Sequence, residues 1–180
     1  MIAPSRILAY VSLSLLLAVG QLAAAADVQR VGGAYVIHLP AATNFGQVVD
    51  RLQHEILAHN WEVLKTQDID EGLKQHYGLD IQNKVVYACK SQYLAQAIKE
   101  DPNITLIVPC RFAVYRVGPA GEAVSGKVDE ECRGGKIVVG VADPVHEAEA
   151  LGIQQREAAA LAGKELQAIL QAVADAFKAP

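Results

Sequence analysis

Two stretches of the chain carry apolar residues at helical spacing, and a β-rich region lies between them. The first stretch contains Phe45, Val48, Val49, Leu52 and Ile56. The second contains Leu166, Ile169, Leu170, Val173 and Phe177. A helix with one apolar face must bury that face against another layer of structure. The pattern therefore predicts an α+β fold in which two main helices pack on one face of an antiparallel sheet.

The β-rich region divides into short segments separated by turn residues. We expect strands over residues 32–40, 61–66, 83–89, 104–117, 123–128 and 136–142. A turn or short helical piece is expected over 68–78, and Ser91 is expected to cap a short helix after the third strand. Pro109 interrupts the segment 104–117 and indicates a bulge, a kink or an edge position. We expect the fold as a whole to follow a β-α-β(4)-α-like order.

Two helix starts are marked by capping residues. Asn44 stands before the first helix, with Gln47 three residues later in a box-like arrangement. Asp143 and Pro144 occupy the cap and first positions of the closing helical region, where the missing N–H of proline costs nothing. Both helices should therefore begin where these residues stand.

The first 26 residues have the pattern of a secretory signal peptide. Arg6 is the only charge before an apolar run over residues 7–19, and small residues end the segment just before Asp27. The run is shorter than the roughly 20 residues that span a bilayer, which argues against a membrane anchor. No cysteine stands at the cleavage site, so a bacterial lipoprotein is not expected. We expect residues 1–26 to be removed, leaving residues 27–180 as a single periplasmic or secreted domain with a C-terminal helical extension.

Charge and hydropathy exclude two classes of partner. The chain has 16 Lys+Arg and 20 Asp+Glu, and loss of Arg6 leaves 15 against 20, a net charge of −5. A mildly acidic chain lacks the basic surface that neutralises phosphates, so we do not expect nucleic-acid binding. No apolar run after the leader is long enough to cross a bilayer, so we expect no stable membrane insertion after cleavage.

Three cysteines follow the leader. Cys89 and Cys110 stand at the ends of predicted strands, and neighbouring strands would place their Cα atoms within the roughly 4.4–6.8 Å that a disulfide needs. A structural disulfide, a thiol, metal or ligand site at the sheet edge, and two unpaired buried cysteines all remain open. Cys132 lies between Glu131 and Arg133 in a loop, where it suits an intermolecular disulfide, metal capture or no function at all.

Thiol reactivity depends on a lowered pKa, which needs a cation or a helix N-terminus nearby. The short helix begins two residues after Cys89, and Arg111 follows Cys110. A helix N-terminus and a cation are therefore both close to the cysteines in sequence. Arg111 is therefore a binding or redox candidate, with a solvated or ion-paired side chain as the alternative. A Cys-x-x-Cys motif is absent from the sequence, so a catalytic redox pair is not expected.

The histidines do not form a metal motif in the sequence. They are His38, His54, His59, His76 and His146, and no two are spaced to ligate one metal from one helix. A copper or zinc site assembled from Cys89, Cys110 and one distant histidine is the metal site that the sequence allows. Otherwise we expect no cofactor.

Several segments resemble the domain of unknown function 302 family. That family shows a cysteine after a strand, then a helix, then a Pro-Cys-Arg segment that leads into a Val-Tyr strand, and the chain matches it at Ala88-Cys89-Lys90 and over 108–115. Residues 44–64, with Trp61 as the aromatic, resemble its first helix and second strand, and Asp143-Pro144 matches its closing Asp-Pro. The resemblance covers residues 34–145 and implies an antiparallel, TBP-like sheet with two helices on one face.

The chain departs from that pattern at two places. Lys90-Ser91 stands where the family pattern has Asn-Pro, and the acidic loop around Cys132 is not part of the pattern. The resemblance implies a fold and no assigned chemistry.

The sequence favours a binding protein over an enzyme. Gly-x-Ser-x-Gly, phosphate-loop and dinucleotide motifs are all absent. We expect an exported, non-catalytic module that binds a small ligand or another exported protein, and a homodimer is one form in which it could act. The alternative is a thiol-redox or metal-handling protein that uses Cys89 and Cys110.

Overall fold

The computed structural model describes residues 27–122, 124 and 135–178. Its strands are β1 (Gln29–Val31), β2 (Ala34–Pro40), β3 (Glu62–Asp68), β4 (Asn83–Cys89), β5 (Cys110–Val117) and β6 (Lys136–Ala142). Its α-helices are α1 (Phe45–Ala58), α2 (Ile69–Tyr77), α3 (Ser91–Glu100), α4 (Pro144–Ala150) and α5 (Glu157–Ala176), and η1 (Pro102–Leu106) is a 3₁₀ helix.

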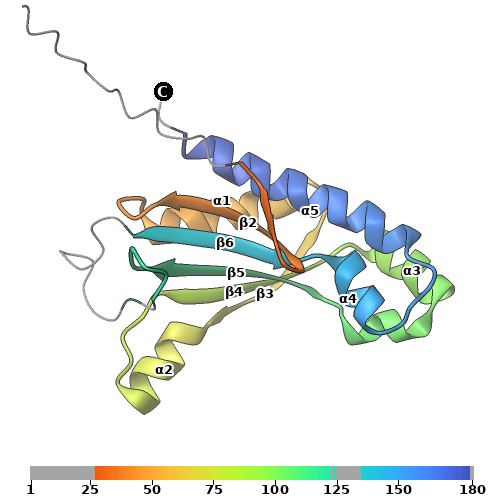
Figure 1. Cartoon of the computed structure of the whole chain (residues 1–180), viewed down its shortest axis with the longest axis horizontal. Helices are drawn as coiled ribbons and strands as arrows, with labels where there is room; N and C mark the ends of the chain where they lie inside the picture. The colour runs from red at the N-terminus through yellow and green to blue at the C-terminus, as the bar shows by residue number, and fades with distance from the viewer. Residues whose placement is uncertain (1–26, 123, 125–134, 179–180) are drawn as a thin grey trace, which may run out of the picture.

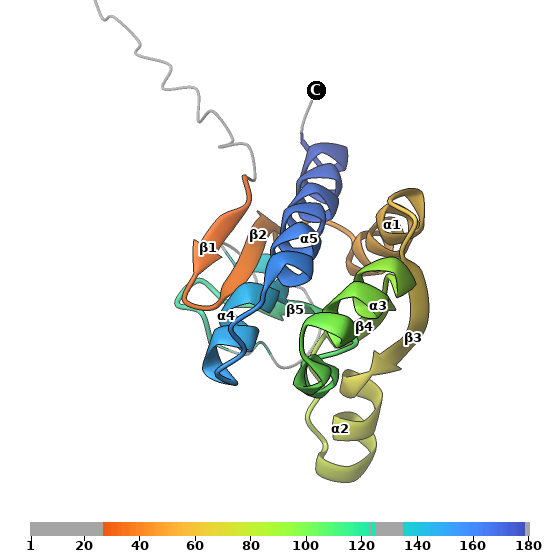
Figure 2. The ribbon, with the colours of Figure 1, turned by 90° about the vertical axis from the view of Figure 1, so that its right-hand side faces the viewer.

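The six strands form one antiparallel sheet in the order β1-β2-β6-β5-β4-β3. The α+β class with an antiparallel sheet is confirmed. Helices α1 and α5 lie on the same side of this sheet, and α2 extends away on the other side (Figure 1). Seen from the end, α5 runs across the sheet with α1 and α3 beside it (Figure 2).

The core forms where α1 and α5 press their apolar stripes on one face of the sheet. Val114, Val139 and Ile37 lie side by side on β5, β6 and β2, and none of them is exposed. The helices contribute side chains that are equally buried: Val48, Leu52, Ile56, Leu166, Ile169, Leu170 and Val173. Both predicted stripes therefore face this core, because alternate strand residues supply the flat apolar layer that they need.

The predicted caps of α1 and α4 are confirmed. The Asn44 side chain accepts a hydrogen bond from the backbone N–H of Gln47 at 3.0 Å. The Asp143 side chain accepts one from the N–H of Val145 at 3.0 Å, with Pro144 as the first helical residue. Ser91 does not cap α3, because the extended residue before it, Lys90, occupies the cap position and leaves Ser91 as the first residue of the helix.

The long strand expected over 104–117 is wrong in its first half. Asp101 caps the 3₁₀ helix η1 by accepting from the N–H of Asn103 at 2.9 Å, and this turn takes the chain out of extended geometry. The Val108–Pro109 peptide bond is cis, and β5 begins only at Cys110. The interruption that Pro109 predicted is thus real, and it separates a helical turn from a strand.

Two other segments differ from expectation. Strand β1 was not predicted, since it has three exposed residues and no apolar alternation, and it adds to the sheet beside β2. The strand expected at 123–128 lies outside the described residues except for Val124, which is buried but not in a strand. Within the part of the chain that the structure describes, no helix is both long and apolar enough to cross a membrane.

Candidate functional site

An apolar cavity of about 40 Å³ lies between α3, α5 and the adjoining ends of β4 and β5. A single water needs roughly 10–15 Å³ of such space, so this cavity has room for a small apolar group. Four alanines from α3 and α5 line much of it: Ala97, Ala158, Ala159 and Ala162. Other lining residues come from the strand ends and from the segments around them: Trp61, Ala88, Cys89, Lys90, Tyr93 and Cys110.

The amino-acid pattern of α5 explains why a cavity forms here. The second half of the helix fills the space over the sheet with large side chains such as Leu166 and Leu170. Its first half has only alanine and glycine at the equivalent inward positions, including Ala158, Ala162 and Gly163. Both halves of the helix lie over the sheet, and the short side chains of the first half do not fill the space between helix and sheet. This leaves a cavity above the ends of β4 and β5.

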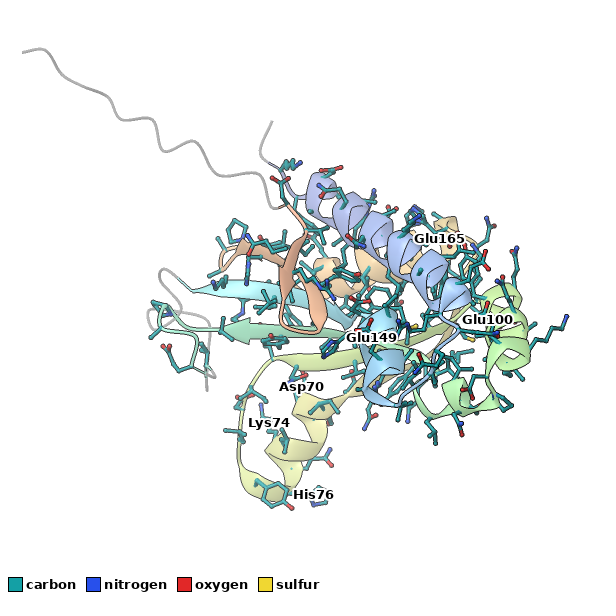
Figure 3. The ribbon with its side chains drawn as sticks, turned by 45° about the vertical axis from the view of Figure 1, so that its right-hand side comes forward. Asp70, Lys74, His76, Glu100, Glu149 and Glu165 are labelled. Atoms are coloured by element: carbon teal, nitrogen blue, oxygen red, sulfur yellow. The ribbon has the colours of Figure 1, made fainter. Side chains whose placement is uncertain are left out.

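A carboxylate beside the cavity gathers three hydrogen-bond donors. Glu165 on α5 accepts from Trp61 Nε1 at 2.7 Å, from Lys90 Nζ at 2.6 Å and from Tyr93 Oη at 2.5 Å. Lys90 Nζ also donates to the carbonyl of His59 at 3.2 Å. Figure 3 labels Glu165 on the helix that crosses the sheet. The network joins α5 to the start of β3, the end of β4 and α3.

The three donors also pack against one another. The Lys90 ammonium lies 5.1 Å from the centre of the Tyr93 ring, within the range of a cation–π contact. The rings of Tyr93 and Trp61 meet edge to face, with their centres 6.1 Å apart. The donors are therefore held in place by contacts that do not depend on Glu165 alone.

The network shifts the ionisation of its members. Burial alone would raise the pKa of Glu165, but hydrogen bonds from Lys90, Tyr93 and Trp61 and the charge of Lys90 outweigh burial and lower that pKa. The hydrogen bond to Glu165, helped by burial and by its negative charge, raises the pKa of Tyr93 to about 12. At neutral pH the site thus holds an ionised carboxylate and a protonated phenol.

The two cysteines both line the cavity, but no disulfide joins them: each is a free thiol. The register explains this correction, because Cys110 lies opposite Ala88 and not opposite Cys89. Successive residues of a strand point to opposite faces of the sheet. Two neighbouring strand ends therefore place the two cysteines close in space without directing their side chains toward each other.

The surroundings of both cysteines suppress their reactivity. Burial raises the pKa of Cys110 to about 12, with Glu147 and Cys89 adding to the effect and Arg111 only partly opposing it. Burial, followed by the negative charge of Glu62, raises the pKa of Cys89. The cation and helix start that suggested an activated thiol are present, but burial and acidic neighbours outweigh them.

The other candidate residues are not brought to the cavity. Arg111 forms an ion pair with Glu147 at 2.9 Å, and its side chain is 53% exposed. Among the described residues, no group of three His, Cys, Asp or Glu side chains is placed to hold a metal ion. The copper or zinc site proposed for Cys89, Cys110 and a histidine therefore lacks a third ligand among them. Cys132 lies outside the described residues.

The sequence singled out Cys89 and Cys110, which line this cavity, but it did not single out the polar network beside them. Trp61 and Lys90 entered only as parts of the family resemblance and its departures, and Glu165 was not singled out. The four alanines are the signal that could have been used, because inward alanines at one end of an otherwise bulky helix indicate either a close approach or a cavity.

The chain belongs to the family described as the domain of unknown function DUF302, whose sequence profile matches residues 37–126. A crystal structure of an uncharacterised conserved DUF302 protein from Bacillus stearothermophilus is similar in fold, with a TM-score of 0.62 at 20% sequence identity. The similarity covers 79% of this chain and 99% of that protein. No curated protein sequence matches the chain. The TBP-like description of the sheet stays a prediction.

Replacing Glu165 by Gln tests the contribution of the network to stability. At pH 7 we expect the variant to lose about 1–2 kcal/mol of unfolding free energy in urea, because charge-assisted hydrogen bonds are lost. Since the folded-state pKa of Glu165 is lowered, the stabilisation it provides is present above the ordinary pKa of 4.5 and lost as the pH falls through the folded value. The difference between wild type and variant should therefore shrink below pH 4.5. The control variant Asp50→Asn, on the exposed side of α1, should show no such pH-dependent loss of stability. A Glu165 effect that is the same at pH 3 and pH 7 would contradict the ion-pair origin.

Alkylation kinetics test the state of the cysteines. A thiol with a pKa of about 12 has about a thousandfold less thiolate at pH 8 than one with the ordinary value of 9.0. We expect iodoacetamide to modify Cys110 in the folded protein at least a hundredfold more slowly than in urea, with peptide mass spectrometry resolving each site. Labelling of both Cys89 and Cys110 as fast as in the unfolded chain would instead support a redox role.

Proposed function

We propose that the chain is an exported, non-catalytic module that binds a small, mostly apolar molecule in the cavity between α3 and α5. The observation that carries this proposal is the cavity itself, which is lined by alanine and other apolar side chains and bounded at one edge by the Lys90–Glu165 pair. A concave apolar site with a few convergent polar groups is the usual form of a small-ligand site. A protein partner is less well supported, because the feature is a small cavity between helices.

The chemistry around the cavity supports binding over catalysis. A nucleophile would need a lowered pKa or a base in hydrogen-bond reach. Of the two thiols at the cavity, Cys110 has a pKa near 12 and Cys89 has a raised pKa. The carboxylate of Glu165 is occupied by three donors, so it is poorly suited to take up a proton.

The redox or metal-handling alternative rests on the same two cysteines. It is supported by their common position at the cavity. It is opposed by their raised pKa values and by the strand register, which does not direct the two side chains toward one another. We therefore assign neither cysteine a chemical role in the binding site.

Export is proposed from the leader sequence. A single charge at Arg6, a short apolar run and an alanine-rich end just before Asp27 are what signal peptidase substrates share. A periplasmic or secreted location would also expose the module to molecules from outside the cell.

Fluorescence titration tests the binding proposal, because Trp61 is the single tryptophan of the chain and lines the cavity. We expect toluene, a neutral single-ring probe that can place its methyl end in the cavity and the rest of its ring at the open side, to change Trp61 emission in a saturable way. Ala159→Leu should weaken this binding at least tenfold by filling the cavity, whereas Ala160→Leu on the exposed side of α5 should leave it unchanged.

Ala97→Leu fills the same cavity from α3 and serves as an independent check if Ala159→Leu perturbs the helix. Circular dichroism establishes that each variant is folded. If toluene produces no saturable change in the folded wild-type protein, or if both cavity-filling variants bind it as well as wild type does, the cavity is not a binding site.

Expression of the full chain in a secreting bacterial host tests export. We expect the protein recovered from the periplasm or medium to start near Asp27, as measured by intact mass. A matched Arg6→Glu variant should be processed less completely, because the positive n-region is lost. Full-length protein confined to the cytoplasm would contradict the export proposal.

A further inference from the structure

Three donors from separate parts of the chain converge on a single carboxylate. Trp61 precedes β3, Lys90 follows β4 and Tyr93 is in the first turn of α3, yet their polar atoms all lie 2.5–2.7 Å from the oxygens of Glu165. Such an arrangement, with one full positive charge and two neutral donors, matches what a carboxylate ligand requires.

All three donors also line the apolar cavity, whereas Glu165 does not. Glu165 stands three residues after Ala162, which does line it, so the carboxylate reaches the donors from the rim. A molecule in the cavity would therefore have its polar end within reach of the same donors.

Glu165 and its donors differ in how far their side chains are exposed to water. The Glu165 side chain is 29% exposed, so it can turn toward water and be solvated there. Lys90 is only 13% exposed at its side chain, and Trp61 is 3% exposed. Buried donors left without an acceptor are costly, so Glu165 leaves only when another acceptor takes its place.

We propose that Trp61, Lys90 and Tyr93 form a carboxylate-binding site that Glu165 occupies in the unliganded protein, and that the ligand of the cavity is a small monocarboxylic acid. The ligand carboxylate replaces that of Glu165, which keeps the charge of Lys90 compensated, and the apolar body enters the cavity between the alanines. The exchange forms and breaks no covalent bond. This inference rests on the proposed function, because it identifies the chemical class of the ligand for the same site.

An internal competitor has a measurable consequence. When the donors are occupied by Glu165 for most of the time, the apparent affinity for an added carboxylate falls by the fraction of time for which they are free. Removing the Glu165 carboxylate should therefore strengthen the binding of an acid and leave the binding of a neutral molecule of the same shape nearly unchanged.

The test compares benzoate with benzamide, which have nearly the same shape and differ in charge, by titration of Trp61 fluorescence. In the wild-type protein we expect benzoate to bind more tightly than benzamide. Glu165→Ala should tighten benzoate binding by about tenfold or more, and Glu165→Gln serves as a second variant if the alanine protein is not folded. Glu157→Ala on the exposed side of the same helix should change neither ligand.

Lys90→Met completes the design, since it keeps a long apolar side chain and removes the charge. We expect it to abolish the preference for benzoate while toluene still binds. The carboxylate assignment is overturned if the wild-type protein and the Glu165 variants all bind benzoate no more tightly than benzamide while they still bind toluene. The proposed function would then stand. If neither toluene nor benzoate binds, both fail.

A probe with a free chain terminus separates two sources of carboxylate. If acetyl-glycyl-phenylalanine binds more tightly than benzoate, the site takes a protein C-terminus and the small-acid assignment is wrong. Weaker binding of this peptide than of benzoate is the expected result, because the cavity of about 40 Å³ has room for a small group only.

Discussion

The packing of α5 across the sheet is the contact on which the rest of the molecule depends. Leu166, Ile169, Leu170 and Val173 are all fully buried between the sheet and α1. Burying side chains of this size removes most of their apolar surface from water, which is the main favourable contribution to folding. The same helix also creates the candidate site, because its first turns carry alanine where its later turns carry leucine and isoleucine. The second half of α5 thus contributes buried apolar packing, and its first half leaves the cavity.

The Glu165 network has a structural role and a proposed functional role that follow from the same geometry. It ties α5 to α3, to the start of β3 and to the end of β4, beside the apolar cavity. Its three donors, Trp61, Lys90 and Tyr93, lie within the residues 37–126 that the family profile matches, whereas Glu165 lies outside them. The family match therefore covers the donors of the network and does not cover the carboxylate that they share.

The cysteines show that two residues can be brought to one cavity without being paired. Their places at strand ends do bring Cys89 and Cys110 to one cavity. The disulfide that this proximity allowed is absent, because Ala88 is the residue that faces Cys110 across the ladder. A pairing between strands depends on register, and a shift of one residue reverses the face to which a side chain points.

The sequence by itself determined the elements that depend on local periodicity and local hydrogen bonding. The stripes of α1 and α5, the strand β4 and the caps at Asn44 and Asp143 could all be predicted, because each depends on residues within a few positions of one another. Strand β1 was missed because it has no apolar alternation, and the 3₁₀ turn η1 was taken for the start of a strand because its β-branched residues Ile104 and Thr105 favour extended backbone.

Only the tertiary structure decided which residues share a site. Glu165 lies 72 to 104 positions along the chain from Tyr93, Lys90 and Trp61, and no spacing rule connects residues so far apart. They meet because α5 returns across the sheet after β6 and lies beside α3, a placement set by the burial of its apolar face. Glu165 stands at the rim of that face, so its partners are the residues that the neighbouring strand ends and α3 bring there. For this reason the network could not be predicted from local sequence pattern.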